Sequence, residues 1–118
     1  VEITPKGNFY KQSEMAALML LMYQKNAENK QLILDGKQPK EFPEEFLKIH
    51  TAQLTDSTNR TLEFKTFSDF YLRNMKSVFE PTKESLINKH NNTINSCITC
   101  HQTTCVGPIP KIKKLLIQ

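Results

Sequence analysis

The stretch Cys97-Ile98-Thr99-Cys100-His101 restricts what this chain can fold into more than any other part of its 118 residues. Two cysteines separated by two residues, with a histidine directly after the second, form the attachment signature of a c-type haem. In a helix, residues three apart share a face. Both thiols can then reach the vinyl groups of one porphyrin, while the next residue turns its imidazole to the iron. We therefore expect a helix here, with His101 as the proximal iron ligand.

Two other chemistries use paired cysteines. A tetrahedral zinc site needs four ligands, and one can be drawn from Cys97, Cys100, Cys105 and either His101 or His90. However, zinc-binding pairs normally sit on turns, and the sequence has no second pair of ligands. A redox dithiol belongs at the start of a helix that follows a strand. The expected position at the end of a helix favours haem over both.

Apolar residues recur with helical spacing through most of the chain. We expect four helices, over about residues 9–34, 43–53, 61–79, and from 82–85 to the haem motif. Pro81 ends the third helix, because proline cannot continue the backbone hydrogen-bond ladder. Four amphipathic helices with short connections favour an antiparallel bundle, whose core can hold a cofactor between facing side chains. The predicted fold class is all-α, with no convincing strand.

The composition fits a single domain with a cofactor in its core. A chain of 118 residues and 13.7 kDa is the size of one domain, with a bundle over 9–103 and a C-terminal tail over 104–118. Its hydrophobic content of 38% is low for a self-sufficient core, and haem would supply apolar surface. A net charge of +4 is too mild to indicate a nucleic-acid-binding protein. No apolar run approaches the roughly 20 residues of a membrane span.

The beginning of the chain predicts an exported protein. It starts with Val1-Glu2 instead of methionine, which is typical of a mature form whose signal peptide has been removed. Covalent haem attachment of this kind occurs after export. We therefore expect the protein in a bacterial periplasm or an equivalent compartment.

The haem motif at the end of a fourth helix resembles the cytochrome c′ family, the four-helix class of c-type cytochromes. The similarity extends from about Phe9 to Cys105 and includes Tyr10-Lys11-Gln12-Ser13-Glu14-Met15 in the first helix. Two features depart from the family, because the second helix is shortened and the chain continues well beyond His101. The resemblance implies a divergent member with a C-terminal extension and one haem, bound covalently through Cys97 and Cys100.

The resemblance also places Met15 on the distal face of the haem, opposite His101. There the family often has an apolar side chain that crowds the iron without binding it. A methionine sulfur can instead ligate iron or simply fill the core. Leu18 and Met19 would be its neighbours in the same pocket, and Lys11 could pair with a haem propionate or lie on a solvated face.

The remaining cysteine and histidines have several possible roles. Cys105 follows His101 too closely to reach the other face of the same haem, so it is a buried thiol, half of an intersubunit disulfide, or a thiolate ligand to a partner subunit's haem. His90 lies about three helical turns before His101 and cannot reach that face either. His50 could meet a propionate or the haem edge. For both histidines a structural role is favoured over ligation.

Two functions follow, and neither is enzymatic. The resemblance favours binding of a diatomic gas such as NO or CO, by a scavenger, carrier or sensor. The alternative is single-electron transfer to a redox partner protein through a six-coordinate low-spin haem, with Met15 or a partner's Cys105 thiolate as sixth ligand. We expect an apolar distal pocket without a hydrogen-bond donor, which disfavours O₂ activation. Leu20 and Leu21 are consistent with a homodimer or heterodimer, and the basic-apolar tail is expected to pack on the bundle or to form a subunit contact.

Overall fold

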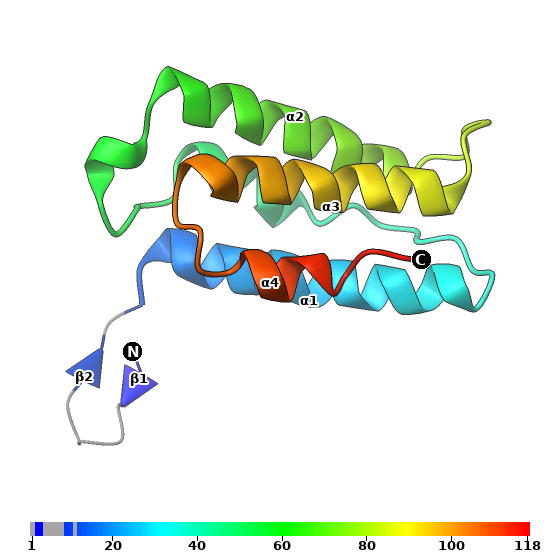
Figure 1. The fold of residues 1–118 in the computed structure, drawn as a ribbon, viewed down its shortest axis with the longest axis horizontal. Helices are drawn as coiled ribbons and strands as arrows, with labels where there is room; N and C mark the ends of the chain where they lie inside the picture. Colours follow the sequence, from blue (N-terminus) through cyan, green and yellow to red (C-terminus); the bar gives the residue numbers. More distant parts are fainter. Residues whose placement is uncertain (1, 4–8, 11) are drawn as a thin grey trace.

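Three long helices and one shorter helical segment form the body of the molecule (Figure 1). The helices are α1 (Glu14–Leu34), α2 (Leu62–Val78) and α3 (Leu86–Thr103), and α3 runs opposite to α1 and α2. The segment η1 (Glu44–His50), a 3₁₀ helix, takes the place of the second helix. The computed structural model describes residues 2–3, 9–10 and 12–118. The predicted helical bundle is confirmed at this level.

Each long helix begins at a hydroxyl residue that caps its first turn. The side chains of Ser13, Thr61 and Ser85 accept hydrogen bonds of 3.1 Å from backbone N–H groups three residues later. Such caps satisfy donors that would otherwise lack a partner at a helix start. At the other end of α1, Gly36 takes a positive φ of 75°, which glycine adopts without steric cost. The helix boundaries are therefore local properties of the sequence.

The first two predicted helices differ from the observed ones at their ends. The first helix begins at Glu14 and not at Phe9, because Ser13 caps it there. Phe9–Tyr10 (β2) instead pairs antiparallel with Glu2–Ile3 (β1). The segment predicted over 43–53 spans only Glu44–His50 and has 3₁₀ geometry. These corrections shorten the first helix but leave the order of the bundle unchanged.

The main core lies between α1, η1 and α2. It includes Met15, Leu18 and Met22 of α1 with Phe46 of η1 and Met75 of α2. Met75 is fully buried, with 0% of its surface exposed. This cluster leaves the side of α1 that carries Met19 turned toward α3. Among the described residues, no helix is long and apolar enough to cross a membrane.

The C-terminal tail folds back along the bundle, as expected for a segment that packs on it. It contains the short helix α4 (Ile109–Lys113), which lies along the bundle (Figure 1). A second cluster joins Ile112 and Leu115 of the tail to Ile94 and Ile98 of α3. Hydrogen bonds hold its far end. The His90 Nε2 donates to the Leu115 carbonyl at 2.8 Å, and the Asn91 side chain pairs at 2.9 Å with both the N–H and the carbonyl of Ile117.

Candidate functional site

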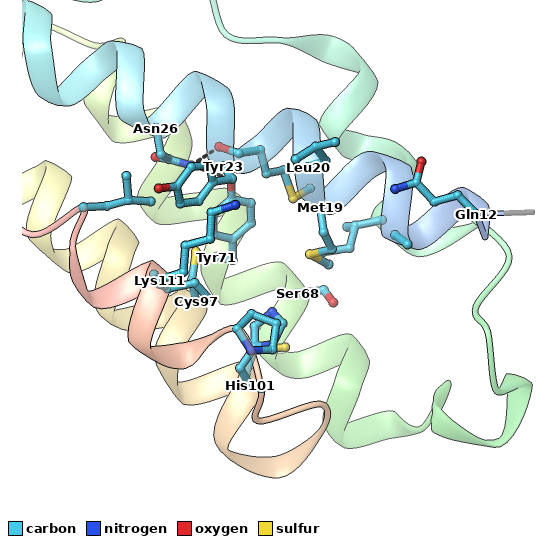
Figure 2. A pocket seen from close by; sticks show the side chains of 18 residues that line it. Gln12, Met19, Leu20, Tyr23, Asn26, Ser68, Tyr71, Cys97, His101 and Lys111 are labelled. Carbon is cyan, nitrogen blue, oxygen red and sulfur yellow. Dashed lines mark hydrogen bonds between the residues drawn. The ribbon is translucent and has the colours of Figure 1, made fainter. Parts of the chain in front are cut away.

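A cavity of about 510 Å³ lies between α1, α2, α3 and the C-terminal tail (Figure 2). Its volume falls within the range of about 300–1,000 Å³ that is usual for ligand and cofactor sites. The lining is mostly apolar, and all four of these segments contribute to it, together with Ile49 of η1. The fold thus provides a mostly apolar space where the predicted haem motif ends.

The three residues of the motif line this cavity together. Cys97, Cys100 and His101 stand on the last two turns of α3, and the helix brings both thiols and the imidazole to one wall. This is the arrangement that the spacing of the motif predicts. None of the three cysteines forms a disulfide, and all of them lie in the described part of the chain.

One hydrogen bond determines which ring nitrogen of His101 carries the proton and which is free to bind a metal. The His101 Nδ1 lies 2.8 Å from the Cys105 carbonyl oxygen. A carbonyl can only accept, so Nδ1 carries the proton and Nε2 keeps its lone pair. Histidines that bind metals are usually oriented in this way by a carbonyl or carboxylate. The imidazole is therefore preset to offer Nε2 as a ligand.

The backbone of Cys105 makes this bond possible. Its φ of 59° lies in the left-handed region. Non-glycine residues are uncommon in this region, and those that adopt it are often found at functional sites. The same turn leaves the Cys105 side chain exposed. The expectation of a buried thiol is therefore wrong, because the residue serves His101 through its main chain while its sulfur points away from the core.

The two motif thiols stay protonated near neutral pH. Burial raises the pKa of Cys97 to about 12, and repulsion from Cys100 acts in the same direction. Burial also raises the pKa of Cys100. Redox dithiols depend on the opposite, a lowered pKa that supplies thiolate, so the electrostatics do not suit that chemistry. Across residues 2–3, 9–10 and 12–118, no three His, Cys, Asp or Glu side chains are grouped closely enough to hold a metal ion. The ligands drawn for a zinc site are therefore not gathered into one cluster in this part of the chain.

Helix α1 forms the wall opposite α3, and of Met15, Leu18 and Met19, the three residues predicted for this pocket, Met19 lines it. Met19 and Leu20 line the cavity across from His101 (Figure 2). Met15 and Leu18 instead pack in the main core with η1 and α2. The rotation of α1 about its axis explains this, because residues 15 and 18 are buried in the core while 16, 19 and 23 line the cavity; Met22 belongs to both, and Met19 also packs against the core. Lys11, the candidate propionate partner, lies outside the described residues.

A polar pair on the cavity wall was not expected from the sequence. Asn26 of α1 and Tyr71 of α2 both line the cavity and are only 1% and 3% exposed. The Asn26 Nδ2 donates to the Met22 carbonyl at 2.8 Å and to the Tyr71 hydroxyl at 3.3 Å. The prediction of a pocket without a hydrogen-bond donor is therefore wrong. The sequence feature that could have predicted a polar group here is Asn26, which lies seven positions after Met19 and so on the same face of the helix.

The other candidate groups lie outside the cavity lining or at its edge. His50 pairs with Asp69 at 3.0 Å, and His90 contacts the C-terminal tail, so both have the structural contacts that were favoured for them. Lys111 of α4 lines the cavity, and its ammonium lies 4.4 Å from the centre of the Tyr23 ring. This is a cation–π contact, and it adds a positive charge to the tail side of the site.

Comparisons of the chain with protein-family models, curated proteins and solved structures gave no match. The chemistry of the site therefore rests on the cavity and on the side chains that line it.

Proposed function

We propose that the chain is a monohaem c-type cytochrome that binds a small diatomic gas. In this proposal Cys97 and Cys100 hold the haem through thioether bonds, His101 is the proximal ligand, and NO or CO binds on the α1 side. The observation that carries the proposal is one cavity that receives both thiols and an imidazole whose Nδ1 proton is held by the Cys105 carbonyl.

The residues present fit a covalently bound haem. The cavity is mostly apolar, as the porphyrin face requires, and it lies at the end of α3 where the two thiols emerge. Each thioether forms when a thiol S–H adds across a vinyl double bond, so no oxidant is needed. When bound, the haem supplies an iron atom with a coordination position opposite His101.

The chain's own residues then shape the distal side. Met19 and Leu20 on α1 place apolar surface across from His101, which limits the size of a ligand. Ile112 and Leu115 of the tail cover the cavity from another side, which helps to exclude water. A small uncharged gas suits such a space better than a bulky or ionic substrate.

The proposal also includes the compartment of the protein and its contact with a second subunit. Because thioether attachment of haem occurs after export, we propose an exported compartment such as the periplasm. Leu20 and Leu21 are 42% and 48% exposed on α1, and they would contribute to a contact with a second subunit.

One observation favours electron transfer as the second candidate. The Met19 thioether lines the cavity on the wall opposite His101, and a methionine sulfur can serve as a sixth ligand and raise the reduction potential. In this case the haem is six-coordinate and low-spin, and a redox partner protein replaces the gas. The exposed Cys105 thiol, acting on a partner subunit's haem, would be a further route to six-coordination.

The first test is whether haem attaches to the motif. The chain is produced with a signal peptide in bacteria that carry c-type haem maturation proteins, and the mass of the denatured product is measured. We expect one haem retained after denaturation, and none in the Cys97→Ala, Cys100→Ala double variant. Colourless protein of unmodified mass would refute the proposal.

The second test separates the two functions. We expect the ferrous protein to give a high-spin visible spectrum that changes promptly on addition of CO. A low-spin spectrum unaffected by CO would instead support electron transfer. The variant Met19→Leu then identifies the sixth ligand, because it converts a methionine-ligated haem to the high-spin form and leaves an open site unchanged.

A further inference from the structure

The cavity wall contains one polar pair whose hydrogen bonds remain incomplete. The Asn26 side chain is 1% exposed, yet its Oδ1 has no hydrogen-bond partner among the described residues. Unpaired polar atoms at buried positions are rare in native proteins because they are costly. The free Oδ1 can only accept a hydrogen bond, so it marks a place for a donor such as water, and a hydrogen bond to a diatomic ligand must come from another group.

The directions of the hydrogen bonds identify the group that can donate to such a ligand. Both protons of the Asn26 Nδ2 are used, one on the Met22 carbonyl and one on the Tyr71 hydroxyl. Tyr71 is the acceptor in this bond, so its own O–H proton remains available. Ser68, which also lines the cavity, already donates to the Phe64 carbonyl at 2.7 Å. Tyr23 also lines the cavity, but it is only partly buried, so Tyr71 is the buried hydroxyl donor of the cavity.

The hydroxyl lies on the α1 side of the cavity, at Asn26, about two helical turns along α1 from Met19. Although Tyr71 belongs to α2, its oxygen contacts Asn26 of α1, and α1 is the wall opposite the turn of α3 that carries His101 (Figure 2). Burial raises the pKa of Tyr71 well above 10. The phenol thus stays protonated and remains a donor throughout the neutral range.

We infer that the Tyr71 hydroxyl, positioned by Asn26, donates a hydrogen bond to the gas ligand and sets which gas is held. The inference rests on the proposed function and adds a selectivity to it. A donor favours ligands that draw negative charge onto their outer atom, as NO and O₂ do when they bind ferrous haem. CO draws less charge and gains less. An apolar pocket would not distinguish the gases in this way.

The test uses the haem-loaded protein with CO and NO as probes. We expect Tyr71→Phe to raise the C–O stretching frequency of the CO complex, because the donor that favours charge on the outer atom is lost. The affinity for NO should fall by about 3- to 10-fold, the effect of one neutral hydrogen bond, and the affinity for CO should fall by less. Asn26→Leu should shift the stretching frequency in the same direction.

Two variants serve as controls. Ser68→Ala removes a cavity hydroxyl whose proton is already used, and Lys111→Met removes the nearby positive charge. Ser68→Ala should not move the C–O stretch, and Lys111→Met should move it less than Tyr71→Phe does. A shift in Lys111→Met with none in Tyr71→Phe would overturn the inference, because the field of the ammonium would then account for it.

A measurement on the unaltered protein covers the case in which Tyr71→Phe does not fold. Replacing H₂O by D₂O exchanges the phenol proton, and we expect a small shift of the C–O stretch. No shift would refute the hydrogen bond. The experiment separates the gas-binding function from the role of Tyr71. If the haem-loaded protein does not bind CO, the proposed function is refuted. If CO binds but its stretching frequency does not respond to Tyr71→Phe or to D₂O, the function stands and only the selectivity is overturned.

Discussion

The attachment of the C-terminal tail through His90 gives the sharpest prediction about stability. His90 is 0% exposed, and its Nε2 donates to the Leu115 carbonyl at 2.8 Å. In His90→Ala that buried carbonyl loses its donor, which costs about 1–3 kcal/mol, and the space of the ring adds a cavity penalty. We expect the free energy of unfolding to fall by about 2–4 kcal/mol. Glutamine can donate to the same carbonyl, so His90→Gln should cost only about 1 kcal/mol.

The pH dependence has a definite sign. Burial lowers the pKa of His90 from its ordinary 6.5, and Lys30 adds repulsion, while the hydrogen bond to Leu115 opposes the shift. The unfolded chain therefore binds the proton more readily than the folded one. The contribution of His90 is fully present above pH 6.5 and is lost as the pH falls through the lowered value. The stability gap between the unaltered protein and His90→Gln should thus narrow on acidification.

The assay is urea unfolding followed by far-ultraviolet circular dichroism, at about pH 8 and about pH 5. The control is Asn74→Ala, a partly exposed position on α2 whose side chain bonds within its own helix, to the Phe70 carbonyl at 2.9 Å, and leaves the tail untouched. A gap that stays constant or widens at the lower pH would refute the reasoning about His90. A loss below about 0.5 kcal/mol in His90→Ala would refute the attachment itself.

Three further predictions concern the core, a helix cap and the exposed cysteine. Met75→Ala should lower the free energy of unfolding by about 2–5 kcal/mol, because it opens a cavity at a position that is 0% exposed; a loss under 1 kcal/mol in urea unfolding would contradict the packing. Ser85→Ala removes the cap of α3 and should cost about 1 kcal/mol, whereas Ser85→Thr should cost much less. Cys105→Ala should leave the visible spectrum of the haem-loaded protein unchanged, since His101 uses the backbone carbonyl; a spectral change would support a thiolate ligand from a partner subunit.

Local signals in the sequence predicted much of the fold. Helical spacing located α2 and α3 to within a few residues, and the spacing of Cys97, Cys100 and His101 placed all three on one wall. These features depend on neighbours within one or two turns, so the sequence carries them directly. The start of α1 was misplaced because apolar residues before Ser13 resemble a continuation of the helix, whereas the cap ends it.

The tertiary structure alone decided what faces the motif. Met15 and Met19 are four residues apart on one helix, and only the packing of α1 on η1 and α2 determines which of them is turned to the core. Asn26 and Tyr71 meet across 45 positions of sequence, and the tail returns to cover the cavity through bonds to α3. Periodicity reports that a helix has an apolar face, but the partner of that face is set by long-range contacts. The α3 wall of the cavity can therefore be predicted from one short motif, whereas the residues of the α1 wall are determined only in the folded chain.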